Sequence, residues 1–280
     1  MTSCWTGKPR HWVWGWAMSK THDELMACLK ELRLATARGC CKELADSARR
    51  EQLSYEAYLL EVLQRECQGR RQHRTQRLLR ESRLPVEKSL GSFDMKRLPG
   101  KVSAVVRTLM DGSFVDRKEN VLAFGNPGSG KSHLLCAIGQ ELVRSGRTVY
   151  FRSTNLLVQE LLLAKRELRL PKAIRKLSRY EALILDDLGY VQQSREEMEV
   201  LFTLLAERYE RGSVLLTSNL PFSKWESIFK DAMTTAAAID RLVHHSVILE
   251  LNLPSYRVEQ ARKSKGVSQP EAGTEEPRQG

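Results

Sequence analysis

The chain has 280 residues, and its 45 Lys and Arg against 34 Asp and Glu give a formal net charge of +11, which favours a polyanionic partner. Hydrophobic residues make up 41% and charged residues 28%, a globular composition that excludes wholesale disorder, collagen and a membrane bundle. The six Cys include no C-x-x-C pair, which argues against a zinc finger or a disulfide framework and favours the cytoplasm.

Residues 1–17 differ in composition from the rest of the chain, because they hold four of the five Trp. The apolar run Trp12–Met18 is too short for a signal peptide and has no A-x-A cleavage site. Two interpretations stay open: the segment is an upstream extension of a protein that begins at Met18, or it is a genuine but disordered N-terminus. No run of 18 apolar residues occurs anywhere, so no membrane-spanning helix is expected.

Residues 18–88 carry a helical pattern. Leu25, Leu29 and Leu32 recur at helical spacing, and the Tyr- and Leu-rich stretch 55–63 repeats it. No Pro interrupts the pattern before Pro85, so we predict a small all-α N-terminal domain of about three helices. Residues 89–120 are predicted to form a linker and a connecting helix.

From residue 121 to residue 263, short apolar runs alternate with amphipathic stretches of helical period. This alternation predicts an α/β domain with a parallel sheet covered by helices on both faces. Residues 264–280, rich in Gly, Pro, Glu and Gln, are predicted to be a disordered tail. Five runs are bounded like buried strands: Val121–Phe124, Thr148–Arg152, Ala182–Asp186, Ser213–Thr217 and Val247–Leu251.

The first of these runs leads into a phosphate-binding motif, G-x-x-x-x-G-K-S, which a helical pattern follows. Its glycines let backbone N–H groups surround phosphates, and the helix N-terminus adds the positive end of its dipole. Lys131 is expected to reach the β- and γ-phosphates of ATP, and the Ser132 hydroxyl to bind Mg²⁺. The nucleotide-binding candidates are Gly125, Asn126, Pro127, Gly128, Ser129, Gly130, Lys131 and Ser132.

Next along the chain lies a basic segment, residues 165–179, with seven Lys and Arg and the single acid Glu167. At helical pitch several of these side chains would share one face, although Pro171 is expected to begin a new helix. The excess of base favours contact with the phosphates of DNA over a merely solvated helix face. The candidate DNA-binding residues are Lys165, Arg169, Lys172, Arg175, Lys176 and Arg179.

Two carboxylates, Asp186 and Asp187, end the third buried run, about 50 residues after the phosphate-binding motif. Taken alone, such a pair could be a helix cap and a surface acid. Its position after the motif favours a second half of a nucleotide site, in which Asp186 holds Mg²⁺ through water and Asp187 orients the attacking water.

Three further polar residues follow. Asn219 comes directly after the fourth buried run and could bond the γ-phosphate or the attacking water, although Asn-Leu-Pro also fits a simple turn. Arg241 and Arg257 could each stabilise charge in a transition state or could each be a surface residue.

Five segments, in this order and spacing, resemble the IstB-type helper ATPases of insertion sequences, relatives of the DnaC helicase loaders in the AAA+ class: GNPGSGKSHL, LILDDLG, LLTSNLPFSKW, AAIDRL and PSYR. The resemblance extends upstream through LSYEAYLLEVLQRE and KSLGSFDMKRLP, so that it covers about residues 25–265. The phosphate-binding motif alone occurs in many families, whereas this combination is specific.

The resemblance implies an AAA+ fold with a five-stranded parallel sheet, an ATPase that uses ATP and Mg²⁺, and assembly into a homo-oligomer. Asp187 would stand where many AAA+ enzymes have Glu, so hydrolysis is expected to be slow or dependent on assembly. Asn219 would be the first sensor and Arg257 the second. Arg241 would be the arginine finger that acts on the nucleotide of a neighbouring subunit. The implied partners are double-stranded DNA and a transposase encoded alongside.

Alternatives stay open. Within the same class the chain could be a DnaC-like loader of a replicative helicase. In other classes it could be a small-molecule P-loop kinase, with residues 165–179 as a lid over the nucleotide, or a DNA-binding scaffold with negligible turnover. The pair His244-His245 has no carboxylate or Cys at ligand spacing, so no metal is expected there.

Overall fold

The structure, a computed structural model, describes residues 11–189, 194–225 and 232–264. The chain divides into two compact units, residues 1–76 and residues 77–280, and each is described by itself. The boundary between them lies inside helix α3 (Tyr55–Ser82), whereas the sequence predicted a helical domain that extends to residue 88.

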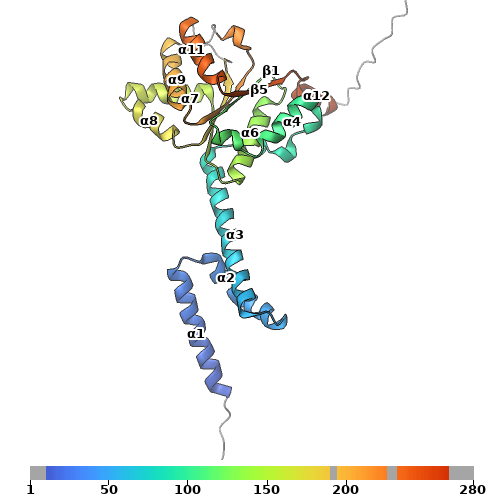
Figure 1. The fold of residues 1–280 in the computed structure, drawn as a ribbon, viewed down its shortest axis with the longest axis vertical. Helices are drawn as coiled ribbons and strands as arrows, with labels where there is room; N and C mark the ends of the chain where they lie inside the picture. Colours follow the sequence, from blue (N-terminus) through green and yellow to red (C-terminus); the bar gives the residue numbers. More distant parts are fainter. Residues whose placement is uncertain (1–10, 190–193, 226–231, 265–280) are drawn as a thin grey trace, which may run out of the picture. The chain divides into compact units, whose positions relative to one another are not determined.

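The first unit is helical, as predicted. It holds α1 (His11–Glu31), α2 (Ala35–Arg50) and most of α3, drawn in blue to cyan in Figure 1. Because α1 begins at His11, the described part of the segment 1–17 is helical, and residues 1–10 lie outside the described residues. The core of this unit is small and consists of Leu29, Ala37, Cys41, Leu44 and Val62.

A single buried carboxylate fixes the start of α2. Glu66 on α3 accepts hydrogen bonds from the backbone N–H groups of Thr36 at 2.8 Å and Ala37 at 3.0 Å, and from the Arg70 side chain at 2.8 Å. The two N–H groups belong to the first turn of α2, whose N-cap residue Leu34 supplies no side-chain cap. Burial alone would raise the pKa of Glu66, but the hydrogen bonds outweigh it and hold that pKa below its ordinary value.

After the end of α3, the second unit continues with a connecting segment, residues 84–119, part of which is bound to helix α6 (Lys131–Arg144). The Gln140 side chain of α6, in a residue that is 4% exposed, donates to the carbonyl oxygens of Pro85 at 2.8 Å and Lys88 at 3.2 Å. The predicted linker is attached to the same helix, because the carbonyl oxygen of Ser89 lies 3.0 Å from His133 Nε2. It contains η1 (Leu90–Ser92), η2 (Met95–Arg97), α4 (Gly100–Leu109) and α5 (Ser113–Asp116).

Five parallel strands form one sheet in the order β2-β3-β4-β1-β5, which confirms the predicted five-stranded parallel sheet. Each strand begins and ends within two residues of the apolar run that predicted it. Because the strands are parallel, their carboxyl ends meet at one edge of the sheet and their amino ends at the other. The strands are β1 (Asn120–Gly125), β2 (Val149–Ser153), β3 (Ala182–Leu188), β4 (Ser213–Ser218) and β5 (Ser246–Leu251).

Helices cover both faces of the sheet (Figure 1), as the alternating pattern predicted. Successive strand side chains alternate between the faces, so that Leu122 packs into one core and Ala123 into the other. No described helix is both long and apolar enough to cross a membrane. The first face carries α7 (Thr154–Arg166), α8 (Leu170–Leu177), α9 (Arg195–Arg208) and α11 (Ala232–Val243), and the second carries α4, α5 and α6. The short helix η3 (Phe222–Lys224) follows β4, and α12 (Tyr256–Ser264) ends the described chain.

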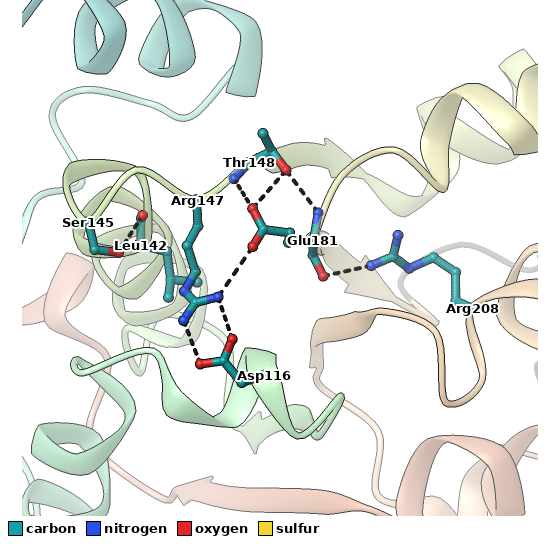
Figure 2. A network of polar contacts seen from close by, with 7 residues as sticks. All are labelled: Asp116, Leu142, Ser145, Arg147, Thr148, Glu181 and Arg208. Carbon is teal, nitrogen blue, oxygen red and sulfur yellow. Dashed lines mark hydrogen bonds and ion pairs between the residues drawn. The ribbon is translucent and has the colours of Figure 1, made fainter. Parts of the chain in front are cut away.

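A network of hydrogen bonds and ion pairs lies at the amino edge of the sheet (Figure 2). Arg147, before β2, pairs with Asp116 at 2.6 Å and with Glu181 at 3.2 Å. The Glu181 carboxylate also accepts from the N–H of Thr148 at 2.8 Å, and its backbone carbonyl oxygen accepts from Arg208 at 3.0 Å. The network joins the starts of β2 and β3 to the end of α9. It lies opposite the carboxyl edge, where parallel α/β sheets bind their ligands. Of the predicted tail, residues 264–280, Ser264 ends α12, and residues 265–280 lie outside the described residues.

Candidate functional site

The loop between β1 and α6 lies at the carboxyl edge, and its backbone requires glycine at two positions. Gly125 has φ +145°, and a Cβ there would collide with the carbonyl oxygen of Leu251. Gly128 has φ +79°, and a Cβ there would collide with the hydroxyl of Ser255. Since no side chain fits at either position, the glycines let the loop take the tight path that the phosphate-binding motif predicts.

Helix α6 begins directly after this loop, at Lys131. The Lys131 ammonium group donates to the carbonyl oxygens of Gly125 at 2.8 Å and Asn126 at 2.9 Å, and the residue is 4% exposed. Burial lowers the pKa of Lys131, while the charges of Asp187 and Asp186 oppose that change. The helix N-terminus and the ammonium group together offer positive charge to an anion such as a phosphate group.

The two carboxylates near the end of β3 both lie in a bulge of that strand. The β3–β4 register shifts between Leu185 and Leu188, and Asp187 has the left-handed φ of +60°. The Asp187 N–H donates to the Thr217 hydroxyl oxygen at 2.8 Å, and that hydroxyl donates to Asp186 Oδ1 at 2.7 Å. Asp186 is therefore held against β4, whereas Asp187 lines the pocket beside the loop.

Charges of both signs meet around Asp187. Burial and then the charge of Asp186 raise the pKa of Asp187 above its ordinary value. Lys131, Lys88 and Arg257 act in the opposite direction. The carboxyl group consequently lies among three cations, an arrangement that can orient a water molecule next to bound phosphates.

These groups surround a pocket of about 460 Å³. Of the residues predicted from the sequence, its lining includes Pro127 to Ser132 of the loop together with Asp187, Asn219 and Arg257. Asn219 Oδ1 is buried and has no hydrogen-bond partner among the described residues, so it is free to bind a ligand. The structure thus brings together groups that are far apart in the sequence.

Two oxygen donors beside the phosphate-binding loop suit a magnesium ion. Ser132 lines the pocket, and the Asp186 carboxylate, in a residue that is 7% exposed, lies near the carboxyl end of β3, next to the pocket residue Asp187. Hydroxyl and carboxylate oxygens are the ligands that Mg²⁺ prefers, usually with several retained waters. The residues present therefore fit the ion that the sequence predicts.

A second wall of the pocket comes from residues that the sequence did not single out. Phe93 contacts the ring of His133 edge to face, with 5.2 Å between ring centroids. Arg97 donates to the carbonyl oxygen of Pro254 at 3.0 Å and pairs with Glu259 at 3.1 Å. No spacing rule marks these residues, and only the resemblance of the KSLGSFDMKRLP segment pointed to this stretch. The additional lining residues are Lys88, Ser92, Phe93, Asp94, Arg97, His133, Leu253 and Tyr256.

Helix α12 brings Arg257 to the pocket. The N–H of Tyr256 donates to the carbonyl oxygen of Gly128 at 3.0 Å, which ties the first turn of α12 to the phosphate-binding loop. Arg257 follows directly and lines the pocket. Arg257 therefore lies beside the loop, and its role as a sensor of bound nucleotide stays a prediction.

Arg241, by contrast, is not among the residues that line this pocket. It lies on α11, where it donates to the carbonyl oxygen of Ala237 at 3.0 Å and stacks over the ring of Phe202 at 4.9 Å. Its side chain remains partly exposed. The pocket of one chain therefore forms without the predicted arginine finger.

The basic segment divides into two helices at the place that Pro171 predicted, because α7 ends at Arg166 and α8 begins at Leu170. Lys165 faces α9, where it pairs with Glu199 at 2.8 Å. Arg169 pairs with Glu167 at 2.5 Å. These two candidates for DNA binding already have anionic partners within the chain.

The remaining candidates belong to α8 and the turn after it. Ile174 and Leu177 of this helix are buried in the core, which directs the basic side chains outward. No residue of the segment 165–179 lines the pocket. The exposed bases that form no ion pair with an acid in the described part of the chain are Lys172, Arg175, Lys176 and Arg179.

Comparison with known proteins connects this site to a family. The family model described as IstB-like ATP binding protein matches residues 27–264. A protein of Sinorhizobium fredii named as an insertion-sequence ATP-binding protein is 42% identical over 238 residues, covering 85% of this chain and 80% of the relative. One of Pseudomonas aeruginosa, named for the insertion sequence IS21, is 39% identical over 241 residues, covering 86% and 91%. The crystal structure of the DnaC helicase loader has a similar fold, with a TM-score of 0.51 at 17% identity, covering 59% of this chain and 97% of that chain.

Proposed function

The chain belongs to the family of IstB-like ATP-binding proteins, and from this premise we propose that it is an ATPase that helps an insertion sequence to transpose. In its ATP state it assembles on double-stranded DNA and acts with the transposase encoded alongside. The observation that carries the proposal is the pocket in which the phosphate-binding loop meets Asp187, Asn219 and Arg257.

Within one subunit the pocket binds ATP. The N–H groups of the loop surround the phosphates, and Lys131 moves from its carbonyl partners to the β- and γ-phosphates. Ser132 and, through water, Asp186 would hold Mg²⁺, which neutralises charge on the phosphates. Asp187 orients the attacking water, and Arg257 stabilises negative charge on the γ-phosphate.

Hydrolysis is completed between subunits in this proposal. Arg241 does not line the pocket of its own chain, yet its guanidinium group is partly exposed on α11. A neighbouring subunit can therefore receive it as an arginine finger. Fingers supplied in trans raise hydrolysis by roughly 10³ to 10⁵, so assembly would turn a slow enzyme into an active one.

The exposed basic side chains of α8 are the proposed contact with DNA. They are Lys and Arg without interleaved aromatic residues, a composition suited to sequence-independent contact with the phosphate backbone. The short amphipathic helix presents them on the side away from its buried residues Ile174 and Leu177.

Two alternative functions are distinguished from the proposed one by different observations. A small-molecule kinase would need residues 165–179 as a lid, but none of them lines the pocket. A helicase loader remains the second candidate because the fold is similar to that of DnaC. The neighbouring gene distinguishes it: a transposase with an integrase-type catalytic domain supports the transposition helper, and replication genes support the loader.

The first test concerns the pocket itself. Lys131→Ala removes the cation expected on the phosphates, so ATP binding should weaken at least about tenfold and turnover should vanish. Binding of a fluorescent ATP analogue, ATPase activity and particle size are measured with and without duplex DNA. Wild-type turnover in the variant would overturn the assignment of the pocket, and a monomer indifferent to DNA would overturn the assembly.

A further inference from the structure

We propose that Glu210, His244 and His245 form a zinc-binding site on the second unit. One ligand atom from each of the three residues lies within 4.8 Å of the other two. No carboxylate stands at ligand spacing from the histidine pair in the sequence, but the fold brings Glu210, just after α9, to the turn that follows α11. The site lies near the amino edge of the sheet, away from the nucleotide pocket.

One buried side chain holds the turn with the two histidines. Asn120, at the start of β1, donates through its side chain to the carbonyl oxygen of Leu242 at 3.0 Å and through its backbone to that of His245 at 2.7 Å. Asn120 Oδ1 accepts from the N–H of Val214 on β4 at 2.9 Å. The end of α11 is thereby fixed to the strand that follows the turn of Glu210.

A second buried side chain holds the turn with the carboxylate. Arg208, which is 2% exposed, donates to the carbonyl oxygens of Glu181 at 3.0 Å and Ser213 at 2.9 Å, and Figure 2 shows the first of these bonds. The Arg208 carbonyl oxygen accepts from the N–H of Gly212 at 3.1 Å. Glu210 thus belongs to a short turn anchored on both sides, so all three ligands come from fixed backbone.

The chemistry of the three groups suits Zn²⁺ better than a hard cation. Two imidazoles and a carboxylate are common zinc ligands, and a water would complete a tetrahedral site. Zinc bonds of about 2.0 to 2.2 Å place ligand atoms roughly 3.4 Å apart, and the three exposed side chains can rotate to close that gap. The C-terminal end of α11 adds the negative end of a helix dipole, which attracts a cation.

A neighbouring hydroxyl group orients one of the ligands. Tyr209 Oη lies 3.0 Å from His244 Nδ1. When Nδ1–H donates to this oxygen, Nε2 carries the lone pair that a metal ion binds. Such a partner fixes the tautomer and the ring orientation of a ligating histidine.

Zinc would then clamp the end of α11 to the turn after α9. Arg241 lies one helical turn before His244, so the ion would also steady the helix that carries the proposed finger. Zinc binding itself depends only on the geometry of the three ligands. Its test therefore stands apart from ATP hydrolysis.

The experiment titrates the full chain with Zn²⁺ by calorimetry, under reducing conditions and without nucleotide. His244→Ala and His245→Ala should each lose one zinc equivalent relative to the wild type, and Glu210→Gln, which keeps the shape of the side chain, should lose the same equivalent. The matched control His73→Ala removes an exposed histidine from the first unit and should change nothing. Tyr209→Phe should keep the equivalent but bind it about tenfold more weakly.

Two further measurements, thermal unfolding and the spectrum of bound Co²⁺, test whether the metal occupies this site. Thermal unfolding without zinc should be the same for the wild type and the three ligand variants, since the three ligands are exposed. Added zinc should raise the unfolding temperature of the wild type, the control and, to a smaller extent, Tyr209→Phe, but not that of the ligand variants. Co²⁺ in place of zinc should give a tetrahedral spectrum without thiolate charge-transfer bands, which separates the site from the free cysteines. Equal stoichiometry and affinity in the wild type and both histidine variants would overturn the proposal.

Discussion

At the residue scale, the site depends on backbone geometry as much as on residue type. Asp186 and Asp187 are adjacent in the sequence, but the bulge at the end of β3 gives them different surroundings. Asp186 is bound to Thr217, while Asp187, at φ +60°, lines the pocket. A left-handed conformation is uncommon outside glycine and is retained mainly where surrounding contacts impose it. Here the contact is the hydrogen bond from the Asp187 N–H to Thr217.

The raised pKa of Asp187 predicts an acid limb in the pH profile of hydrolysis. Because the ionised carboxylate is the form that orients water, activity should fall as the pH drops through this pKa, which lies above the value of about 3.9 for an ordinary Asp. Asp187→Asn should bind ATP but hydrolyse it at least about a hundredfold more slowly. The measurements are kcat against pH and nucleotide affinity, with Asp187→Glu as the control that keeps a carboxylate. An Asn variant with wild-type kcat would refute the role of Asp187.

The sequence could predict those parts of the site that are contiguous in the chain. The phosphate-binding loop follows β1, and the Asp pair lies at the carboxyl end of β3, so the local sequence pattern was sufficient. Phe93 and the cluster around Glu210 could not be predicted this way, because their partners are brought in by the fold from distant parts of the sequence. Local periodicity carries no information about such contacts.

At the element scale, the strands were predictable because buried parallel strands are nearly continuous apolar runs. For the connecting segment the sequence predicted a linker and a connecting helix, but not the contacts of this segment with α6. In the structure the Gln140 side chain donates to the carbonyl oxygens of Pro85, Val86 and Lys88, and His133 Nε2 lies 3.0 Å from the carbonyl oxygen of Ser89. These contacts turn a segment without long helices or strands into one wall of the pocket.

Glu66 predicts a measurable contribution to the stability of the first unit. Glu66→Gln should lower the free energy of unfolding by about 1–3 kcal/mol, because the N–H groups of Thr36 and Ala37 lose a buried charged acceptor. Since folding lowers the pKa of Glu66, this stabilisation is complete above the unfolded-state pKa of about 4.3 and is lost as the pH falls through the folded value.

Chemical unfolding of the full chain, with hydrogen exchange of the α2 amides, measures this effect at neutral and acidic pH. Glu61→Gln is the matched control on the same helix, because it removes only a surface pair with Arg65 at 3.8 Å and should cost little. Equal losses in the two variants would show that Glu66 does not hold α2.

Helix α8 carries the prediction for DNA. Charge reversal at Lys172 and Lys176 should weaken duplex binding and reduce the slope of log K against log salt by about 2, as for two lost phosphate contacts. Reversal at Lys101 and Arg107, two exposed bases on α4, changes the net charge equally and serves as the control. Binding is measured by fluorescence anisotropy across a salt titration. Equal weakening of DNA binding in both variants would show that net charge alone causes the effect, and would contradict a contact through α8.

At the scale of the whole molecule, a single chain builds an ATP pocket without Arg241. The proposed enzyme is therefore active only where subunits meet, and its assembly on DNA would switch on hydrolysis. Arg241→Ala should leave ATP binding unchanged and lower the turnover of the assembled protein by roughly 10³ to 10⁵. In the single chain the Arg241 guanidinium group lies over the ring of Phe202 on α9.

Mixing two inactive variants tests the sharing of the site between subunits most directly. Lys131→Ala lacks a working pocket but keeps Arg241, and Arg241→Ala keeps the pocket but lacks the finger. In an equal mixture with duplex DNA, random assembly unites a working pocket with a working finger at about a quarter of the interfaces. The ATPase rate of the mixture should rise to about that fraction of the wild-type rate. A mixture that hydrolyses no faster than the average of the two variants would contradict a site shared between subunits.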